Sequence, residues 1–382
     1  MIRVGFIGAV STDWMGGLNY YKNLLYALAK RDDKSISPVV FVGKQTDSNI
    51  KEMFSEYAEV IEHSMFDKKS LLWYVWKIGY KYFKTSYLVN RICVEHNIDI
   101  LSHSGMVGLK NVKTINWIPD FQHIHLPEMF SSEEIEKRDA NFLTMIKDSD
   151  RVIVSSYDAL KDLNTINNNY GHKVNVLQFV SQPNNAYFTL NDIDKKKLIE
   201  KYTLPEDFYY IPNQFWKHKN HMLVLEAIKY LKDKDIWVNI VFTGHMEDYR
   251  NKTHMDKIRE YIVLNHLEDR VMLLGLIDYE DVFSLMKFSK AVINPSLFEG
   301  WSSTVEECKS IGKNMILSDL NVHVEQCPEA QFFDRSSYVS LANALQNYSF
   351  VDEKKEINIK ERTENFASNY IAIVKEVIND NR

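Results

Sequence analysis

The chain has 382 residues, a formal net charge of −6 and 45% hydrophobic residues. This length allows roughly two domains of ordinary size, each with its own core. The acidic balance excludes a dedicated nucleic-acid-binding protein, which would carry a net basic surface. The three cysteines are too widely spaced for a disulfide framework or a CxxC metal pair, so we expect a reducing, cytoplasmic setting.

The N-terminal half alternates short apolar runs with amphipathic segments. Predicted strands cover 2–8, 38–43, 98–103, 113–118, 151–155 and 174–180. Predicted helices include 17–31 and 132–148, and Ser131 with Glu134 forms a capping-box pattern before the second of them. Short, continuous apolar strands separated by helices predict a parallel sheet that is covered on both faces.

A polar stretch at 181–206 is the expected inter-domain connection, and a second strand-helix series follows it. Its predicted strands are 207–212, 236–243, 270–274, 290–294, 314–318 and 331–333, and its predicted helices are 219–232, 252–265, 278–288, 302–312, 335–348 and 353–379. We therefore predict an α/β protein with two doubly wound, Rossmann-like domains that face each other across a cleft. The expected domains are 1–182 and 183–361, with a C-terminal helix at about 362–382 that packs back on the first domain. Ligands in such sheets bind beyond the carboxyl ends of the strands.

No window of the sequence approaches the ~18 apolar residues of a membrane-spanning helix, so we predict no membrane span. The segment 69–97 interleaves aromatic residues with four basic ones, Lys77, Lys81, Lys84 and Arg91. Two interpretations stay open: the helix lies on an anionic bilayer, or it buries Trp73, Trp76 and Tyr80 against the sheet. We expect a cytoplasmic protein, with peripheral contact at the cytoplasmic face of the inner membrane as the open alternative.

The stretch SLFEGWSSTVEECKSIGK, residues 296–313, reads as a loop beyond a strand followed by a helix. Glu299 is placed on the loop, where chemistry occurs in this architecture. Glu306 has only polar neighbours at helical spacing and is expected to be solvated, whereas Glu307 borders the apolar stripe and is expected to be partly buried. A buried carboxylate without a basic neighbour needs hydrogen-bond donors, which a polyhydroxylated ligand would supply.

The start of the same helix offers free backbone amides and the positive end of the helix dipole. The residues concerned are Gly300, Trp301, Ser302, Ser303 and Thr304. Such a helix start favours the binding of an anion. The alternative is an ordinary acidic helix without a ligand.

A second candidate site is the segment IPNQFWKHKNH, residues 211–221, which follows a predicted strand and opens a helix. Its candidate ligand-binding residues are Asn213, Gln214, Lys217 and Lys219. An ammonium at a helix start, together with the free amides there, can hold a diphosphate. The alternative is a basic first turn that binds nothing.

Two further candidate sites lie in the first half of the chain. Gly16 and Gly17 stand between the first strand and a helix, where paired glycines allow a ligand to approach the backbone closely. Asp120 and His123 follow the strand at 113–118, although a lone histidine is more often structural. Asp148-Ser149-Asp150 precedes a strand, so we interpret it as a connection and predict no bound metal.

The segment FEGWSSTVEE, with Glu299 and Glu307 in E-x7-E spacing, resembles the signature of family-4 retaining glycosyltransferases of the GT-B fold. The preceding P-S-x-F-E-G and the following I-G-K-x-x-I-L-S-D match that pattern as well. The resemblance implies that Glu299 contacts sugar hydroxyls, Glu307 takes the ribose hydroxyls and Lys219 grips the diphosphate. It also implies that the Gly16-Gly17 loop faces the donor phosphates and the acceptor, and that His123 approaches the donor sugar.

The sequence departs from that family at Gln214, where an arginine usually neutralises phosphate charge. Lys217 and His218 are the two candidates to replace it.

The resemblance implies a function: transfer of a sugar, with retention of configuration, from a nucleotide-diphosphate sugar to a saccharide or lipid-linked saccharide acceptor. Such enzymes are hexosyltransferases that need no metal or resident cofactor, and many build bacterial O-antigen, capsule or similar surface polysaccharide. The sugar, the choice between UDP and GDP, and the acceptor stay open. Two alternatives remain, a GT-B-shaped sugar-nucleotide epimerase and a non-catalytic sugar-nucleotide-binding protein.

Overall fold

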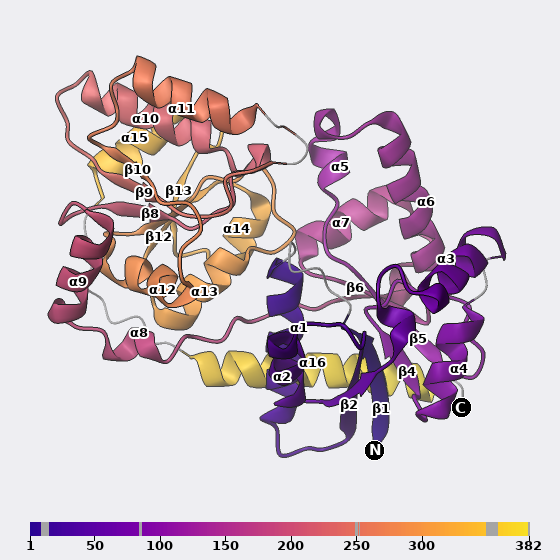
Figure 1. Ribbon diagram of the computed structural model, residues 1–382. Helices are drawn as coiled ribbons and strands as arrows, with labels where there is room; N and C mark the ends of the chain where they lie inside the picture. Colours follow the sequence, from indigo (N-terminus) through magenta and orange to yellow (C-terminus); the bar gives the residue numbers. More distant parts are fainter. Residues whose placement is uncertain (9–14, 84–85, 249–250, 252, 349–357, 381–382) are drawn as a thin grey trace. The chain divides into compact units, whose positions relative to one another are not determined.

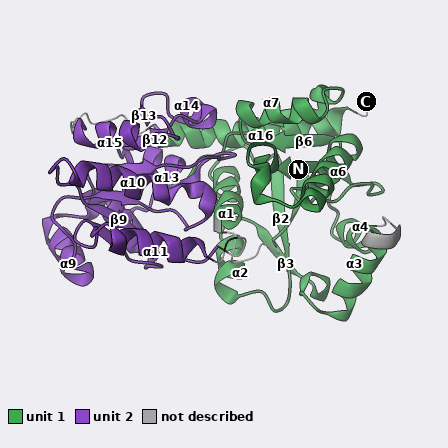
Figure 2. Cartoon of the chain, turned by 90° about the horizontal axis from the view of Figure 1, so that it is seen from above, with its two compact units in different colours: residues 1–181, 359–382 green, residues 182–358 purple. Residues whose placement is uncertain are grey.

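The computed structural model describes residues 1–8, 15–83, 86–248, 251, 253–348 and 358–380. The chain forms two compact units, which Figure 2 shows in different colours. Unit 1 consists of Met1–Ser181 and Ile359–Arg382, and unit 2 consists of Gln182–Asn358. Each unit has its own parallel sheet and its own core.

Unit 1 contains a sheet of seven parallel strands in the order β3-β2-β1-β4-β5-β6-β7. The strands are β1 (Ile2–Ile7), β2 (Ile36–Val42), β3 (Glu59–Glu62), β4 (Ile100–Ser102), β5 (Lys113–Ile118), β6 (Arg151–Val154) and β7 (Val174–Val176). The sequence prediction missed β3, because Glu59–Glu62 is a short edge strand with glutamates at both ends rather than a continuous apolar run. The chain runs outward from β1 to β3 and then returns to β4 on the other side, so the topological switch point lies between β1 and β4.

Helices of unit 1 cover both faces of this sheet (Figure 1). They are α1 (Met15–Ala29), α2 (Ser48–Ser55), α3 (Leu71–Phe83), α4 (Tyr87–Glu95), α5 (Gln122–His125), α6 (Ser132–Asp148), α7 (Tyr157–Ile166) and α16 (Ile359–Asn379), with 3-10 turns at Ser64–Phe66, Pro127–Met129 and Gly171–Lys173. The predicted capping box of Ser131 and Glu134 is confirmed at the start of α6. The last helix, α16, belongs to this unit because its buried side chains pack there, and Tyr370 Oη donates to Ser102 Oγ at 2.8 Å.

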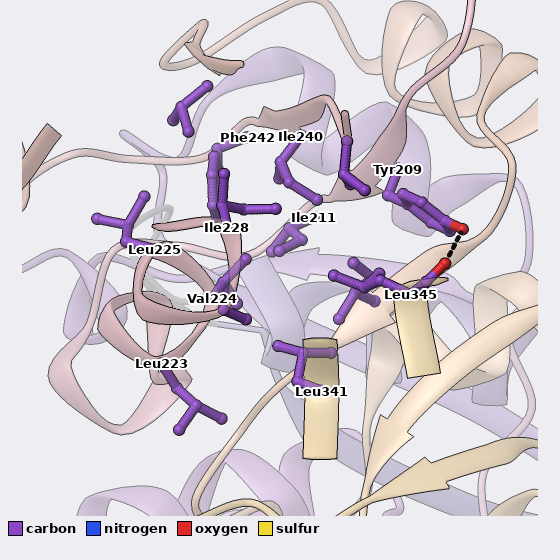
Figure 3. Close-up of a cluster of buried hydrophobic side chains, with 14 of the residues drawn as sticks. Tyr209, Ile211, Leu223, Val224, Leu225, Ile228, Ile240, Phe242, Leu341 and Leu345 are labelled. Carbon is purple, nitrogen blue, oxygen red and sulfur yellow. Dashed lines mark hydrogen bonds between the residues drawn. The ribbon is translucent and has the colours of Figure 1, made fainter. Parts of the chain in front are cut away.

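Unit 2 contains a sheet of six parallel strands in the order β10-β9-β8-β11-β12-β13. The strands are β8 (Tyr209–Ile211), β9 (Ile240–Phe242), β10 (Val271–Leu273), β11 (Val292–Asn294), β12 (Met315–Ser318) and β13 (Gln331–Phe333). Successive residues of β8 join different cores: Tyr209 and Ile211 pack in one cluster and Tyr210 in the other. Figure 3 shows the first cluster, in which Tyr209 Oη donates to the Leu345 carbonyl at 3.0 Å. Both faces of this sheet are therefore buried, as the apolar strands predict.

The helices of unit 2 include two within the stretch that the sequence suggested as a loose connection. They are α8 (Ala186–Thr189), α9 (Asp192–Tyr202), α10 (His221–Lys232), α11 (His254–Leu264), α12 (Tyr279–Phe288), α13 (Ser303–Ile311), α14 (Asn321–Gln326) and α15 (Tyr338–Gln346), with a 3-10 turn at Lys217–Lys219. Asn191 and Asp194 form a capping box on α9, so the polar composition there reflects a mostly exposed helix. Among all helices in the described ranges, none is both long and apolar enough to cross a bilayer.

Candidate functional site

Two loops meet at the topological switch point of unit 2, between β8 and β11. One follows β8 and leads through the turn Lys217–Lys219 into α10, and the other follows β11 and leads into α13. The backbone amide of Leu297 in the second loop donates to the His218 carbonyl in the first at 2.8 Å. In open α/β sheets this is the place where ligands bind.

The centre of the candidate site is an ion pair between these loops. Lys219 Nζ lies 2.7 Å from Glu299 Oε1, and the two side chains are only 16% and 11% exposed. The hydroxyl of Ser296 also donates to Glu299 Oε1 at 2.7 Å. Burial raises the pKa of Glu299, but the Lys219 ammonium, His323 and the Ser296 hydroxyl outweigh this effect and lower it to about 2. Glu299 is therefore an anion at any physiological pH.

A hydrogen-bond network of neutral side chains holds the two loops and the start of α13 in place. Asn213 Nδ2 donates to Asn294 Oδ1 at 3.2 Å, and Asn294 Nδ2 donates to Ser302 Oγ at 2.9 Å. Thr304 Oγ1 donates to Asn213 Oδ1 at 3.2 Å. Asn213 and Ser302 are buried, so their side chains serve the framework of the site. The sequence did not single out Asn294, whose role depends on its position at the end of a central strand.

The helix predicted over 302–312 is present as α13, Ser303–Ile311. Ser302 is the N-cap, and its side chain accepts from the Val305 amide. The predicted anion-binding residues Gly300 and Trp301 lie at the end of the loop, and Ser303 is the first residue of the helix. All three are partly exposed. The first amides of a helix have no acceptor within it, so those of Ser303 and Thr304 are available to an anion by position.

The sequence prediction for Glu306 was wrong. Glu306 is fully buried, where it accepts from Gln326 Nε2 at 3.0 Å and lies 3.4 Å from Lys309 Nζ. Gln326 also bonds both the amide and the carbonyl of Ser302, at 3.1 and 2.9 Å. The reason for the error is that Gln326 comes from α14, twenty residues later, so no neighbour in sequence reveals the partner.

Glu307, the next residue of α13, is partly exposed. Within the described ranges no side chain donates a hydrogen bond to its carboxylate, and burial raises the pKa of Glu307 to about 7. The rings of Tyr210 and Tyr279 are near enough for its charge to raise their pKa values further, after burial has done so. Tyr279, at the start of α12, is 52% exposed. The sequence did not single it out, because nothing in its local pattern separates it from an ordinary surface tyrosine.

The basic turn after β8 contains the candidates for the missing arginine. Gln214 is partly buried, Lys217 is exposed and His218 is buried. The Lys217 amide donates to Asp248 Oδ2 at 3.0 Å, which fixes the turn and leaves its ammonium at the surface.

His323 is a further residue that the sequence prediction missed. It lies on α14 and is fully buried, with Nδ1 at 3.0 Å from the Ser318 carbonyl and 3.1 Å from Ser318 Oγ. Ser318 Oγ donates to the Ser296 carbonyl at 2.7 Å, which connects His323 to the loop that carries Glu299. Burial lowers the pKa of His323, while the Glu299 charge opposes this effect.

The candidate residues of unit 1 follow its strands β1 and β5. Gly16 and Gly17 lie in the first turn of α1 rather than in a loop. His123 is buried on the short helix α5, and its Nε2 lies 2.9 Å from Asp139 Oδ1. Asp120 Oδ1 accepts from the Gln122 amide at 3.1 Å and shapes the turn before α5.

The acidic residues around β6 have structural roles. Asp148 ends α6 and Asp150 precedes β6, where Asp150 bonds Lys113 at 3.0 Å, so this pair is the structural connection that the sequence predicts. In the part of the chain that the structure describes, no group of three His, Cys, Asp or Glu side chains is arranged to hold a metal ion.

The chain is similar to known proteins in part of its sequence and in its fold. Residues 194–365 match the family model described as "Glycosyl transferases group 1". No curated protein sequence matches the chain significantly.

Solved structures share the fold of the whole chain. A glycosyltransferase from Rickettsia africae ESF-5 has a TM-score of 0.68 at 17% identity and covers 99% of both chains. Anabaena Alr3699/HepE in complex with UDP and glucose has a TM-score of 0.66 at 14% identity, over 100% of this chain and 99% of the other. A UDP-N-acetylglucosamine 2-epimerase has a TM-score of 0.54 at 13% identity, over 99% of this chain and 96% of the other. These similarities establish the GT-B type of fold, with its two doubly wound sheets. The segment that matches the family model, residues 194–365, carries the Lys219–Glu299 pair.

Proposed function

We propose that the protein is a retaining glycosyltransferase that moves a sugar from a nucleotide-diphosphate sugar to a saccharide or lipid-linked saccharide acceptor, in the synthesis of a surface polysaccharide. The observation that carries the proposal is the ion pair of Lys219 and Glu299 at the switch point of unit 2. The family match of the same segment supports it, as does the similarity in fold to a protein that binds UDP and glucose.

The donor diphosphate would lie between the Lys219 ammonium and the first amides of α13. A diphosphate needs compensating charge, and a lysine together with a helix start supplies it. Glu299 Oε1 is occupied by Lys219 and Ser296, which leaves Oε2 to accept from a sugar hydroxyl. Binding in this way keeps the carboxylate paired and orients the sugar at the same time.

The nucleoside would lie along α13, with its ribose hydroxyls donating to Glu307. The carboxylate of Glu307 obtains no donor from the described residues, so a ribose would satisfy a group that folding leaves without hydrogen bonds. In unit 1, Gly16, Gly17 and Asp120 would contact the donor or acceptor and His123 the donor sugar. These assignments rest on the family resemblance.

The reaction proposed is departure of the diphosphate with attack by the acceptor hydroxyl on the same face of the sugar. The transition state has oxocarbenium character, and the negative charge that develops on the leaving diphosphate is stabilised by Lys219 and the helix amides. With glutamine at 214, Lys217 in the same turn is the side chain best placed to add a second positive charge, because its ammonium is exposed. The proposal includes no metal or resident cofactor, and activity that persists in EDTA tests this point.

Calorimetry tests the donor site directly. UDP and GDP are titrated into the wild-type protein, into Lys219→Met and into the control Lys229→Met, which removes an exposed lysine from α10. We expect Lys219→Met to weaken binding by roughly tenfold or more, because a charge-assisted contact is lost. Equal binding by wild type and Lys219→Met would overturn the proposed site.

A second experiment separates transfer from epimerisation. Nucleotide-sugars that raise the melting temperature are first identified, since a ligand of the native state stabilises it. The best of them is then incubated with and without saccharide acceptors. Release of nucleoside diphosphate only with an acceptor supports transfer, and NMR of the product reports whether the anomeric configuration is retained. Interconversion of the sugar without an acceptor would instead indicate an epimerase.

A further inference from the structure

The outward face of α3 carries a concentrated apolar surface. Twenty large apolar side chains are exposed among the described residues, and five of them fall within the eight positions 71–78. Four of these five, Leu71, Tyr74, Val75 and Ile78, are between 47% and 80% exposed. Their spacing of three, four and seven places them on one side of the helix. We call these four residues the outer stripe.

The opposite side of α3 is anchored in unit 1. Trp76 is buried, and Trp73 and Tyr80 pack against the same hydrophobic cluster. Ser70 Oγ accepts from the Trp73 amide at 3.0 Å and holds the first turn. Since a rotation that buried the outer stripe would expose two tryptophans, the stripe is a fixed feature of the surface. The two tryptophans and Tyr80 therefore anchor the helix, while Tyr74 and three aliphatic side chains form its exposed apolar face.

The charged residues around the outer stripe are all basic. The segment 68–84 contains five lysines and no acidic residue, in a chain whose net charge is −6. Lys68, Lys69 and Lys77 are exposed, and none of them pairs with a carboxylate among the residues that the structure describes. Lys77 Nζ lies 4.5 Å above the centre of the Trp76 ring. Figures 1 and 2 both show α3 beside α4 at the periphery of unit 1.

We propose that the outer stripe and its flanking lysines form a docking surface for an anionic lipid bilayer, with α3 lying in the plane of the interface. An interfacial helix inserts its apolar side about 5–10 Å into the boundary of headgroups and acyl chains. Lysines beside it reach the phosphates with their flexible stems. Two copies of the stripe would bring lysines of equal charge together, so this charge pattern disfavours self-association. The docking surface does not depend on the donor site of unit 2.

Vesicle co-sedimentation of the full chain tests the proposal. Vesicles of phosphatidylcholine alone are compared with vesicles of phosphatidylcholine and phosphatidylglycerol. We expect the wild-type protein to bind the anionic vesicles at least about tenfold more tightly, and salt to weaken that binding. The triple variant Leu71→Gln/Val75→Asn/Ile78→Asn should lose roughly tenfold or more in affinity for anionic vesicles, because three inserted side chains become polar. Lys68→Gln/Lys69→Gln should lose roughly tenfold or more as well.

A matched control removes exposed apolar residues elsewhere. Val263→Asn/Leu264→Gln changes two side chains of α11 that are 57% and 70% exposed, and should leave vesicle binding unchanged. All of these positions are at the surface, so circular dichroism and the melting temperature should match the wild type. Wild-type protein that binds neither vesicle, or a triple variant that binds like the wild type, would overturn the proposal. So would light scattering that shows a wild-type dimer and a monomeric triple variant, because the stripe would then be a contact between copies.

Discussion

Lys219 and Glu299 form a buried ion pair at 2.7 Å, although eighty positions separate them in the chain. The pair joins the loop after β8 to the loop after β11, on the two sides of the switch point of unit 2. Because both charges are largely withdrawn from water, each depends on the other. Loss of either partner would leave a largely buried charge unpaired, so we expect single substitutions in the pair to destabilise unit 2.

The stability of unit 2 should depend on the charge of Glu299. The pKa of Glu299 is about 2 in the folded protein, compared with an ordinary value of 4.5. The stabilisation that its carboxylate gives to the folded state is therefore present above pH 4.5 and is lost as the pH falls toward 2. We expect Glu299→Gln to be less stable than wild type by about 3 kcal/mol near pH 6, and this gap to shrink by about half near pH 3. Urea unfolding at several pH values measures it. The surface variant Glu59→Gln is the control, and its free energy of unfolding should stay close to that of the wild type at every pH. A difference between Glu299→Gln and wild type that does not change with pH would contradict the prediction.

Nucleotide affinity should rise with pH through the titration of Glu307. Its pKa is raised to about 7, so the free protein holds a proton there below pH 7 that ribose hydroxyls would displace. We expect binding at pH 6 to release protons, which calorimetry in buffers of different ionisation enthalpy detects. Glu307→Gln should lack this release. Comparison with the variant is essential, because the terminal phosphate of the nucleotide titrates near pH 6 itself.

The raised pKa of Glu307 should also lower the free energy of unfolding at high pH. An acid whose folded pKa lies above its ordinary 4.5 destabilises the protein increasingly as the pH rises from 4.5 to 7, and by a constant amount above that. Glu307→Gln should therefore be more stable than wild type by about 1–3 kcal/mol at pH 8 and equal to it near pH 4. Thermal or urea unfolding at both pH values checks this, and a variant that is less stable at pH 8 would disprove the assignment.

Gln326 should be essential for the start of α13. Its side chain bonds both backbone groups of Ser302 and the buried carboxylate of Glu306. Gln326→Ala leaves three buried polar groups without these partners, and we expect a loss of about 3 kcal/mol in the free energy of unfolding. Gln346→Ala, which truncates an exposed glutamine on α15, is the control and should change stability by less than about 0.5 kcal/mol.

Gly244 should tolerate no side chain, because it supports the loop that carries Asn213. A Cβ atom there would lie 2.5 Å from the Asn213 carbonyl oxygen, and the backbone has φ of +137°. Gly244→Ala should destabilise the protein by about 2–3 kcal/mol and weaken nucleotide binding by roughly tenfold, since Asn213 must move. Gly171→Ala, where a Cβ meets nothing within 4 Å, should behave as wild type in both measurements.

Much of the fold follows from local pattern. Continuous apolar runs such as 38–43 and 314–318 became buried parallel strands, and the capping box at Ser131 started a helix, because these features depend on residues a few positions apart. The edge strand β3 and the helix α9 escaped prediction, since a mostly exposed element has too little apolar pattern to stand out.

The sequence by itself determined that Glu299 lies beyond a strand and that a helix begins near Ser302, because neighbouring residues decide both. Only the tertiary structure decided which carboxylates are paired. Glu299 meets Lys219 and Glu306 meets Gln326 through contacts between elements that are distant in the chain. Burial raises the pKa of Glu307, and none of the described residues donates to its carboxylate to oppose this effect. The ionisation of a buried acid depends on what the whole fold brings within a few ångströms of it, and helical spacing alone carries no information about that.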